Sequence, residues 1–189
     1  NQGQVLECPA KKSPWTTKEF YIKDDYRIII IDEKDLNNME LVLFNMKTCQ
    51  REKIIYMASK QEVITGFSVS DENKIAISKG ISQNKEVIYR TDLLLEDLQN
   101  YHTIKNAIGF QWESKGTRFI YYDVINENTI ICEDNEKSCK VGLEGIFASY
   151  WTTDGDWLIY EDAGHIKKIR VDDKTMKYIV DGHDPIATR

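Results

Sequence analysis

The strongest constraint on this chain is a strand–turn–strand unit that recurs about every 40 residues, a period typical of repeats with four strands per unit. Each copy reads as an aromatic strand, a polar turn and an apolar strand. Trp112 and Trp151 stand at the same distance before Gly116 and Gly155. The copies cover residues 20–30, 66–77, 109–121 and 149–160. A single sheet of this kind has two apolar faces and cannot bury both alone, so the repeat predicts neighbouring sheets that cover each other.

The rest of the chain also reads mainly as strands. Short segments rich in β-branched and aromatic residues recur roughly every ten residues and end in polar or turn residues. The sequence therefore predicts an all-β fold, a small β-propeller of about four four-stranded blades, with Trp112 and Trp151 between blades. The exception is a turn or two of helix expected between Asp92 and Asn100, where leucines cluster.

Residues 1–16 are predicted to form an N-terminal arm and residues 17–189 the propeller domain. The tail at 181–189 is similar to the opening strand of another blade. It either closes the ring against the segment around Trp15 or marks the point where a longer propeller was cut. We favour closure, because the sequence ends there.

The chain carries a formal net charge of −6. This excess of carboxylates disfavours nucleic acid as a partner, because nucleic-acid binders usually carry a basic face. No segment approaches the run of about 18 apolar residues that marks a membrane-spanning helix. The acidic excess is explained most simply by solubility. The alternative explanation is an acidic surface that recognises a basic protein.

The cysteines Cys8, Cys49, Cys132 and Cys139 divide into two predicted pairs. Cys132 and Cys139 flank a polar turn between two apolar stretches, so in a hairpin their side chains face each other within disulfide reach. Cys8 and Cys49 then remain to pair with each other. This interpretation places the protein outside the cytoplasm, in the periplasm or secreted. The alternative is four free thiols in a cytoplasmic protein.

The pattern Trp-x-x-Asp-Gly-x-x-Leu-Ile-Tyr from Trp151 to Tyr160 resembles the repeat of TolB-type, WD-like β-propellers. Residues 112–121 match this repeat more loosely, and residues 69–77 more loosely still. The resemblance covers about residues 15–185 and concerns architecture. It implies an interaction platform, since such propellers mostly bind other proteins, and it carries over no catalytic residue.

Patterns of enzyme chemistry are missing from the sequence. His102, His165 and His183 stand at no metal-ligand spacing, and we expect them on the surface or in loops. No nucleophile elbow, zinc-protease helix or phosphate-binding loop occurs. The segment 181–184, with a histidine between two carboxylates, suits an ordinary polar turn better than a metal site. We expect a non-enzyme without metal or cofactor; an active site at the central channel is the disfavoured alternative.

The expected function is therefore a non-catalytic module that binds another protein. The alternative is an inhibitor, such as an immunity protein, whose acidic face neutralises a basic toxin or nuclease. Acidic side chains that gather on one rim would form the binding surface, and an aromatic side chain there would anchor the partner. The predicted partner-binding residues are Asp24, Asp25, Glu133, Asp134, Glu136, Tyr150, Asp154 and Asp156.

Overall fold

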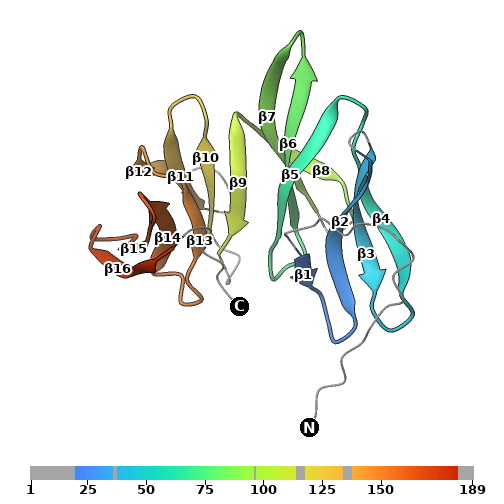
Figure 1. Ribbon diagram of the computed structural model, residues 1–189, viewed down its shortest axis with the longest axis horizontal. Helices are drawn as coiled ribbons and strands as arrows, with labels where there is room; N and C mark the ends of the chain where they lie inside the picture. Colours follow the sequence, from blue (N-terminus) through green and yellow to red (C-terminus); the bar gives the residue numbers. More distant parts are fainter. Residues whose placement is uncertain (1–19, 36–37, 96, 114–117, 134–137, 183–189) are drawn as a thin grey trace. The chain divides into compact units, whose positions relative to one another are not determined.

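The computed structural model describes residues 20–35, 38–95, 97–113, 118–133 and 138–182, which form four four-stranded sheets (Figure 1). In each sheet the strands follow one another in chain order. The first two sheets comprise β1 (Phe20–Ile22), β2 (Arg27–Asp35), β3 (Asn38–Asn45) and β4 (Gln50–Met57), then β5 (Glu62–Val69), β6 (Ile75–Gln83), β7 (Glu86–Leu94) and β8 (Asn100–Lys105). The other two comprise β9 (Ala107–Trp112), β10 (Arg118–Asp123), β11 (Asn128–Glu133) and β12 (Cys139–Glu144), then β13 (Ala148–Trp151), β14 (Trp157–Asp162), β15 (His165–Arg170) and β16 (Met176–Asp181). The predicted all-β class with four four-stranded sheets is confirmed.

The described residues contain no helix, so the helical turn expected between Asp92 and Asn100 is wrong. Strand β7 continues through this segment to Leu94, and β8 begins at Asn100. The leucines cluster for a different reason. Leu93 and Leu94 are consecutive residues of an interior strand, and both are buried. Consecutive apolar residues are typical of a strand that is covered on both faces.

The chain divides into two compact units. The first comprises Asn1–Ile64 with Gly80–Glu86, and the second comprises Thr65–Lys79 with Val87–Arg189. The predicted arm at residues 1–16 lies outside the described residues, so that domain boundary stays a prediction.

In the second unit, an aromatic cluster packs between sheets β5–β8 and β9–β12. Its buried members are Ala76, Leu93, Phe110, Trp112, Phe119 and Cys132. The Trp112 ring stands edge-on to Phe110 and to Phe119, with ring centroids 5.0 and 5.3 Å apart. Aromatic pairs favour this arrangement because the positive edge of one ring meets the negative face of the other. Since Ala76 and Leu93 come from one sheet and the rings from the next, the cluster joins the two sheets.

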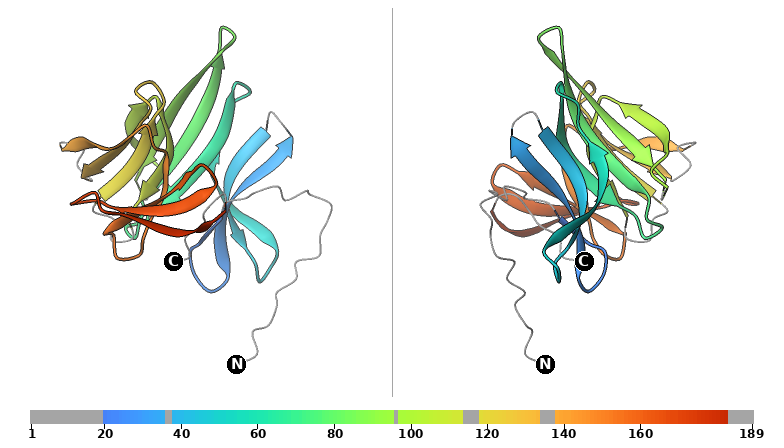
Figure 2. Two further views of the ribbon diagram at one scale, coloured as in Figure 1. Left: turned by 60° about the vertical axis from the view of Figure 1, so that its left-hand side comes forward. Right: turned by 90° about the vertical axis from the view of Figure 1, so that its right-hand side faces the viewer.

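A second cluster joins sheet β9–β12 to sheet β13–β16, which lie side by side in Figure 2. Its buried members are Ile120, Ile131, Leu143, Trp151, Leu158, Tyr160, Ile169 and Val171. Trp151 thus takes the role of Trp112 one sheet later. The prediction that these two tryptophans pack between neighbouring sheets is confirmed within this unit.

The first unit is built on sheet β1–β4. Its buried cluster consists of Ile30, Val42 and Phe44, with Ile28, Met46 and Cys49 packed against it. Asp32 and Glu40 are cross-strand partners on β2 and β3, and both are buried. Arg51 on β4 forms ion pairs with both carboxylates. This pairing matters because a buried carboxylate without a partner would be strongly destabilising.

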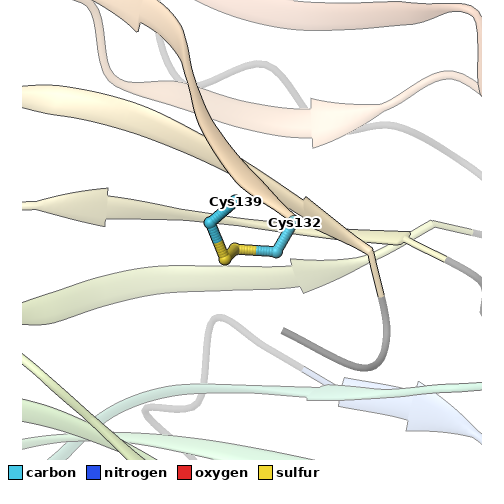
Figure 3. The surroundings of a disulfide bond; sticks show 2 residues. All are labelled: Cys132 and Cys139. Carbon is cyan, nitrogen blue, oxygen red and sulfur yellow. A yellow bond between two sulfur atoms is a disulfide. The ribbon is translucent and has the colours of Figure 1, made fainter. Parts of the chain in front are cut away.

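Cys132 and Cys139 form a disulfide between β11 and β12, as predicted (Figure 3). They are cross-strand partners, and their Cα atoms lie 4.1 Å apart. Cys132 is buried in the aromatic cluster, whereas Cys139 is exposed. The disulfide therefore joins the two strands at the end of their hairpin, and the same hairpin is anchored in the core by the buried Cys132. Cys8 lies outside the described residues, so its pairing with Cys49 stays a prediction.

Replacing Phe119 by alanine is expected to lower the free energy of unfolding by about 3–5 kcal/mol, because the ring is fully buried and its loss leaves a cavity. Urea denaturation measures this change. Ile125→Ala is the matched control: Ile125 is 69% exposed, so its removal should change stability by less than about 0.5 kcal/mol. Equal losses in the two variants would contradict a core built on the aromatic cluster.

Candidate functional site

Asp24 and Asp25 belong to the first unit, in its β1–β2 turn. The Asp24 carboxylate accepts hydrogen bonds from the backbone N–H of Tyr26 at 3.2 Å and of Arg27 at 2.9 Å. It also pairs with the Arg27 guanidinium, whose hydrogen bond is the main reason that the pKa of Asp24 is lowered. Asp24 therefore shapes its turn, while Asp25 is exposed. Two other predicted residues, Asp134 and Glu136, lie outside the described residues.

Glu133, Asp154 and Asp156 lie in the second unit, in a strand and a turn that both contact Arg118. Arg118 begins β10 and is the cross-strand partner of Glu133, the last residue of β11. Asp154 and Asp156 flank the glycine of the β13–β14 turn, whose backbone contacts Arg118. Turns of two neighbouring sheets thus meet at one arginine.

Arg118 is held by a buried carboxylate from its own hairpin. Its Nε and Nη2 donate to the two oxygens of Glu113, each at 2.9 Å. The Glu113 side chain is only 2% exposed and the Arg118 side chain 24%. This two-pronged geometry is the strongest form of ion pair, because two parallel hydrogen bonds fix the guanidinium plane. It also raises the pKa of Arg118.

The same guanidinium crosses to the next sheet. Arg118 Nη2 donates to the carbonyl of Gly155 at 2.6 Å, and its Cζ lies 4.9 Å from the centre of the Trp151 ring. Gly155 has φ +74°, and a Cβ at this position would collide with the Glu113 carboxylate. Glycine is therefore required at this position for two reasons: the positive φ and the close approach of the Glu113 carboxylate.

Asp172, on the β15–β16 turn, completes the arrangement. The backbone N–H of the next-door Val171 donates to the carbonyl of Asp156 at 2.9 Å, so this turn is tied to the β13–β14 turn. The charges of Glu133 and Asp172 both act on Arg118. We call the exposed carboxylates Glu133, Asp154, Asp156 and Asp172 the acidic rim.

The conformation of the β13–β14 turn is set by its own side chains. Asp154 accepts hydrogen bonds from the Thr152 hydroxyl at 2.5 Å and from the backbone N–H of Asp156 at 3.0 Å. The Thr152 hydroxyl in turn accepts one from the backbone N–H of Trp157 at 3.1 Å. These bonds, above all the one from Thr152, lower the pKa of Asp154. Asp154 is thus both a turn-forming residue and a fixed negative charge on the rim.

Two cations near the acidic rim are engaged by other groups, and a third, Lys168, interacts with Asp154. Glu113 neutralises Arg118. Lys174 donates from Nζ to the carbonyl of Gly142 at 2.6 Å, and burial lowers its pKa. The four rim carboxylates therefore face solvent, with Lys140 as an exposed cation close to Lys174.

Tyr150, the predicted aromatic anchor, is half-buried and lies on a face of sheet β13–β16. Its cross-strand partner is Ile159. Because side chains alternate along a strand, Ile159 shares that face with Trp157. The opposite face of the sheet carries Trp151, which packs toward β9–β12. Tyr150 therefore lies on the Trp157 side of the sheet, opposite to Trp151.

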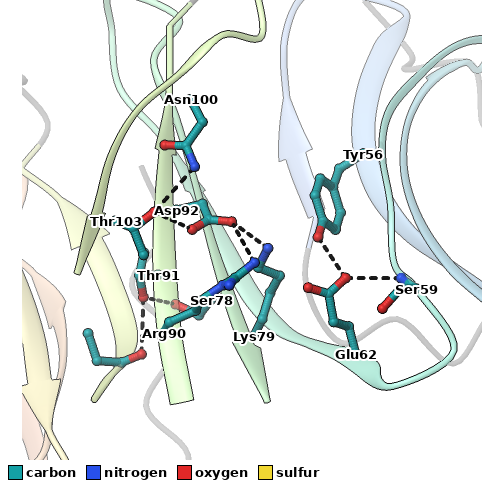
Figure 4. Close-up of polar contacts among 11 residues, drawn as sticks. Tyr56, Ser59, Glu62, Ser78, Lys79, Arg90, Thr91, Asp92, Asn100 and Thr103 are labelled. Atoms are coloured by element: carbon teal, nitrogen blue, oxygen red, sulfur yellow. Dashed lines mark hydrogen bonds and ion pairs between the residues drawn. The ribbon is translucent and has the colours of Figure 1, made fainter. Parts of the chain in front are cut away.

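A buried polar network in sheet β5–β8 is the other concentration of charge (Figure 4). Lys79 forms an ion pair with Asp92, and both side chains are buried. The Thr103 hydroxyl donates to the second Asp92 oxygen at 2.7 Å. Beside them, Ser78 and Thr91 share a hydrogen bond of 2.9 Å between their hydroxyl oxygens. Since these partners lie on neighbouring strands, the network fixes strand alignment inside the sheet.

Figure 4 also shows a small polar group of the first unit. The Tyr56 hydroxyl donates to Glu62 at 2.9 Å, and the backbone N–H of Ser59 donates to the same carboxylate oxygen at 3.0 Å. Glu62 thereby closes the connection between β4 and β5. This group positions a turn, as Asp24 does in the β1–β2 turn.

Sequence reasoning missed Glu113, Arg118 and Asp172. The repeat aligns Arg118 with Trp157, since each is the first residue after its turn. The alignment shows that the two residues occupy equivalent positions in the repeat. It does not indicate that an arginine at this position contacts the next sheet. Asp172 stands in a predicted turn like many other acidic residues, so nothing in the sequence distinguishes it.

Among the described residues, no group of three or more histidine, cysteine, aspartate or glutamate side chains is arranged to hold a metal ion. None of the described segments forms a helix with the length and apolar character needed to cross a membrane.

The chain resembles solved propeller structures in its fold. Regucalcin, a calcium-binding protein of Agrobacterium tumefaciens, is 10% identical with a TM-score of 0.55, covering 88% of this chain and 60% of regucalcin. The Cps50 (Swd1) β-propeller domain of Myceliophteria thermophila is 11% identical with a TM-score of 0.54, covering 88% of this chain and 61% of the domain. The acylaminoacyl peptidase of Pyrococcus horikoshii is 13% identical with a TM-score of 0.51, covering 64% of this chain and 26% of the peptidase.

These similarities confirm the propeller fold class. Each match spans less than two thirds of the solved protein, so this chain corresponds to part of those propellers. No protein-family model matches the sequence, and no curated protein matches it either.

Glu113→Gln is expected to lower the free energy of unfolding by about 1–3 kcal/mol, because it leaves the partly buried Arg118 without its charged partner. Glu133→Gln removes an exposed carboxylate from the same guanidinium and should cost less than about 0.5 kcal/mol. Urea denaturation compares the two. The double variant Glu113→Gln/Arg118→Gln should lose less than the sum of its single variants, since the two side chains act as a pair. Strict additivity would contradict the pairing.

Asp154 is expected to make stability depend on acid pH. Its pKa is lower in the folded protein than in the unfolded chain, where aspartate titrates near about 3.9. The ionised carboxylate therefore stabilises the fold above this pH, and the contribution is lost as pH falls through the folded value. Between about pH 5 and pH 3, Asp154→Asn should lose less unfolding free energy than the natural protein.

Asp156→Asn is the matched control for this measurement, because it removes a charge from the same turn without touching the Thr152 hydrogen bond. The same loss of stability on acidification in the natural protein and in Asp154→Asn would show that the turn does not depend on the ionised carboxylate.

Proposed function

We propose that the chain is a non-catalytic interaction module of the TolB-like, WD-type propeller kind, and that it binds a basic partner protein through the acidic rim. The observation that carries this proposal is a set of four exposed carboxylates on connected turns of two sheets. Glu133 and Asp172 act on the neutralised Arg118. Asp154 and Asp156 flank Gly155, whose carbonyl accepts a hydrogen bond from Arg118, and the turn that carries Asp172 is tied to theirs. The repeat from Trp151 to Tyr160, a strand, an Asp-Gly turn and a second strand, supports the TolB-like assignment.

The carboxylates are held in place before any partner arrives. Arg118 fixes the β13–β14 turn through Gly155, and this turn holds the β15–β16 turn through Val171. Glu133 directly follows Cys132, whose disulfide closes the end of its hairpin. A preorganised surface loses less conformational entropy on binding, so more of its interaction energy is available as affinity.

Charge and geometry together favour a basic protein as the partner. Grouped carboxylates create a local negative potential that attracts cations over roughly 8–10 Å at moderate salt. Arginine side chains suit such a surface best, because each can bind a carboxylate through two hydrogen bonds. An inhibitor that neutralises a basic toxin or nuclease would use the same surface, and the partner's activity distinguishes the two functions.

The polar groups of the rim support binding rather than catalysis. Arg118 is engaged by Glu113 and Gly155, and the Thr152 hydroxyl is engaged in its turn. The polar groups of Arg118 and Thr152 therefore stabilise the fold through hydrogen bonds within the protein. The Cys132–Cys139 bond supports a location outside the cytoplasm, where disulfides persist.

The test is affinity purification with the full chain as bait, followed by binding measurements on the recovered partner. Glu133→Gln/Asp156→Asn/Asp172→Asn should weaken binding roughly tenfold, because three exposed ion pairs are lost at a few tenths to about 1 kcal/mol each. Raising the salt concentration should weaken binding to the natural protein.

The matched control is Glu86→Gln/Glu127→Gln/Glu144→Gln, which removes the same charge at exposed positions of other turns and strands. It should bind as the natural protein does. A partner that binds both triple variants equally, or that is retained equally at low and high salt, would refute the rim as the binding surface. Loss of the partner's enzymatic activity on binding would assign the protein to the inhibitor class.

A further inference from the structure

The face of sheet β13–β16 that bears Trp157 is basic, in contrast to the acidic chain as a whole. Trp157 begins β14 and is 8% exposed. Its ring is flanked by three cations from the two following strands. They are Lys168, with Nζ 4.6 Å from the ring centre, Arg170, with Cζ at 5.4 Å, and Lys177, with Nζ at 5.1 Å.

The strand register explains why these side chains meet. Arg170 is the cross-strand partner of Trp157, and Lys168 is the cross-strand partner of Lys177. Arg170 and Lys168 are two positions apart on β15, so they point to the same side of the sheet. This side is opposite to the one on which Trp151 packs against β9–β12.

Positive charge at this face is only partly compensated. Arg170 lies 3.8 Å from the exposed carboxylate of Asp173, and Lys168 interacts with Asp154. Glu161, two positions after Ile159 on β14, adds one carboxylate on the same face. Lys177 has no ion pair among those formed by the described residues, and it is exposed. Three cations around one ring repel each other, so an anionic group placed between them would be attracted.

We propose that this Trp157 face binds an acidic segment of a partner protein. Carboxylates of the segment would contact Lys168, Arg170 and Lys177, whose side chains cover the Trp157 ring, and its aliphatic carbons would pack on the half-buried Tyr150. Tryptophan, tyrosine and arginine are the residues that most often dominate protein interfaces, because they offer large rigid contact areas. The proposal goes beyond the acidic rim and concerns a ligand of opposite charge.

An acidic protein segment fits this face better than nucleic acid does. The cations surround a single ring, which provides for two or three anionic groups but not for a long phosphate backbone. A nucleic-acid strand that extended past them would meet the carboxylates of the β13–β14 and β15–β16 turns, including Asp154, Asp172 and Asp173. Nucleic-acid binders instead present a continuous basic surface.

The test uses the full chain labelled with ¹⁵N and a deca-glutamate peptide as the probe. The indole N–H signal of Trp157 is assigned with Trp157→Phe. Deca-glutamate should shift this signal more than those of Trp112 and Trp151, because the three cations surround the Trp157 ring while the other two rings pack between sheets. Lys168→Gln/Arg170→Gln/Lys177→Gln should weaken binding roughly tenfold, since three exposed ion pairs are lost.

Lys47→Gln/Lys53→Gln/Lys60→Gln is the matched control, because it removes the same charge from exposed lysines elsewhere. Equal weakening in both triple variants, or a Trp157 signal that does not move, would overturn the proposal. So would a ten-nucleotide thymidine strand that shifts this signal as strongly as deca-glutamate.

A deca-lysine peptide should bind the triple variant Lys168→Gln/Arg170→Gln/Lys177→Gln as it binds the natural protein. This result separates a failure of the Trp157 face from a failure of the acidic rim. The single variant Lys177→Gln, on an edge strand, tests the same point if the triple variant does not fold.

Discussion

Packing of aromatic rings between neighbouring sheets is the interaction on which the second unit depends. Trp112 and Trp151 occupy equivalent positions in successive repeats, and each fills the space between its own sheet and an adjacent one. No single four-stranded sheet could bury these rings, so the stability of each sheet is linked to that of its neighbour. Cooperation of this kind is general in repeat proteins, where every unit is completed by the next.

The acidic rim follows from this packing. Because the sheets are brought together by their cores, their turns meet at one end, and Arg118 can reach from its own hairpin to Gly155 of the next sheet. Glu113 makes this possible by neutralising the guanidinium where it is partly buried. The exposed charges are thus held in place by the ion pair of Glu113 and Arg118 and by the two buried clusters that contain Trp112 and Trp151. The turns that carry the rim carboxylates are therefore fixed by hydrogen bonds to one another and to Arg118.

The fold could be predicted from the sequence because its signal is repeated. Strand-sized apolar segments, turn glycines and the period of the tryptophans all point to four-stranded sheets, and the spacing of Cys132 and Cys139 indicates a hairpin disulfide. The leucines before Asn100 misled because a doubly covered strand and a short helix have the same composition. The rim was predicted only in part, since grouping of turns from different sheets depends on long-range packing that periodicity does not encode.

Gly155 has an evolutionary consequence. A Cβ at this position would collide with the Glu113 carboxylate, so no larger residue fits while that glutamate is in place. Positions 113 and 155 are therefore expected to vary together among homologous chains: a side chain at 155 should be accompanied by a shorter residue at 113, and then by loss of the arginine at 118. Covariation of this triplet would record the contact between two sheets without any structure being determined.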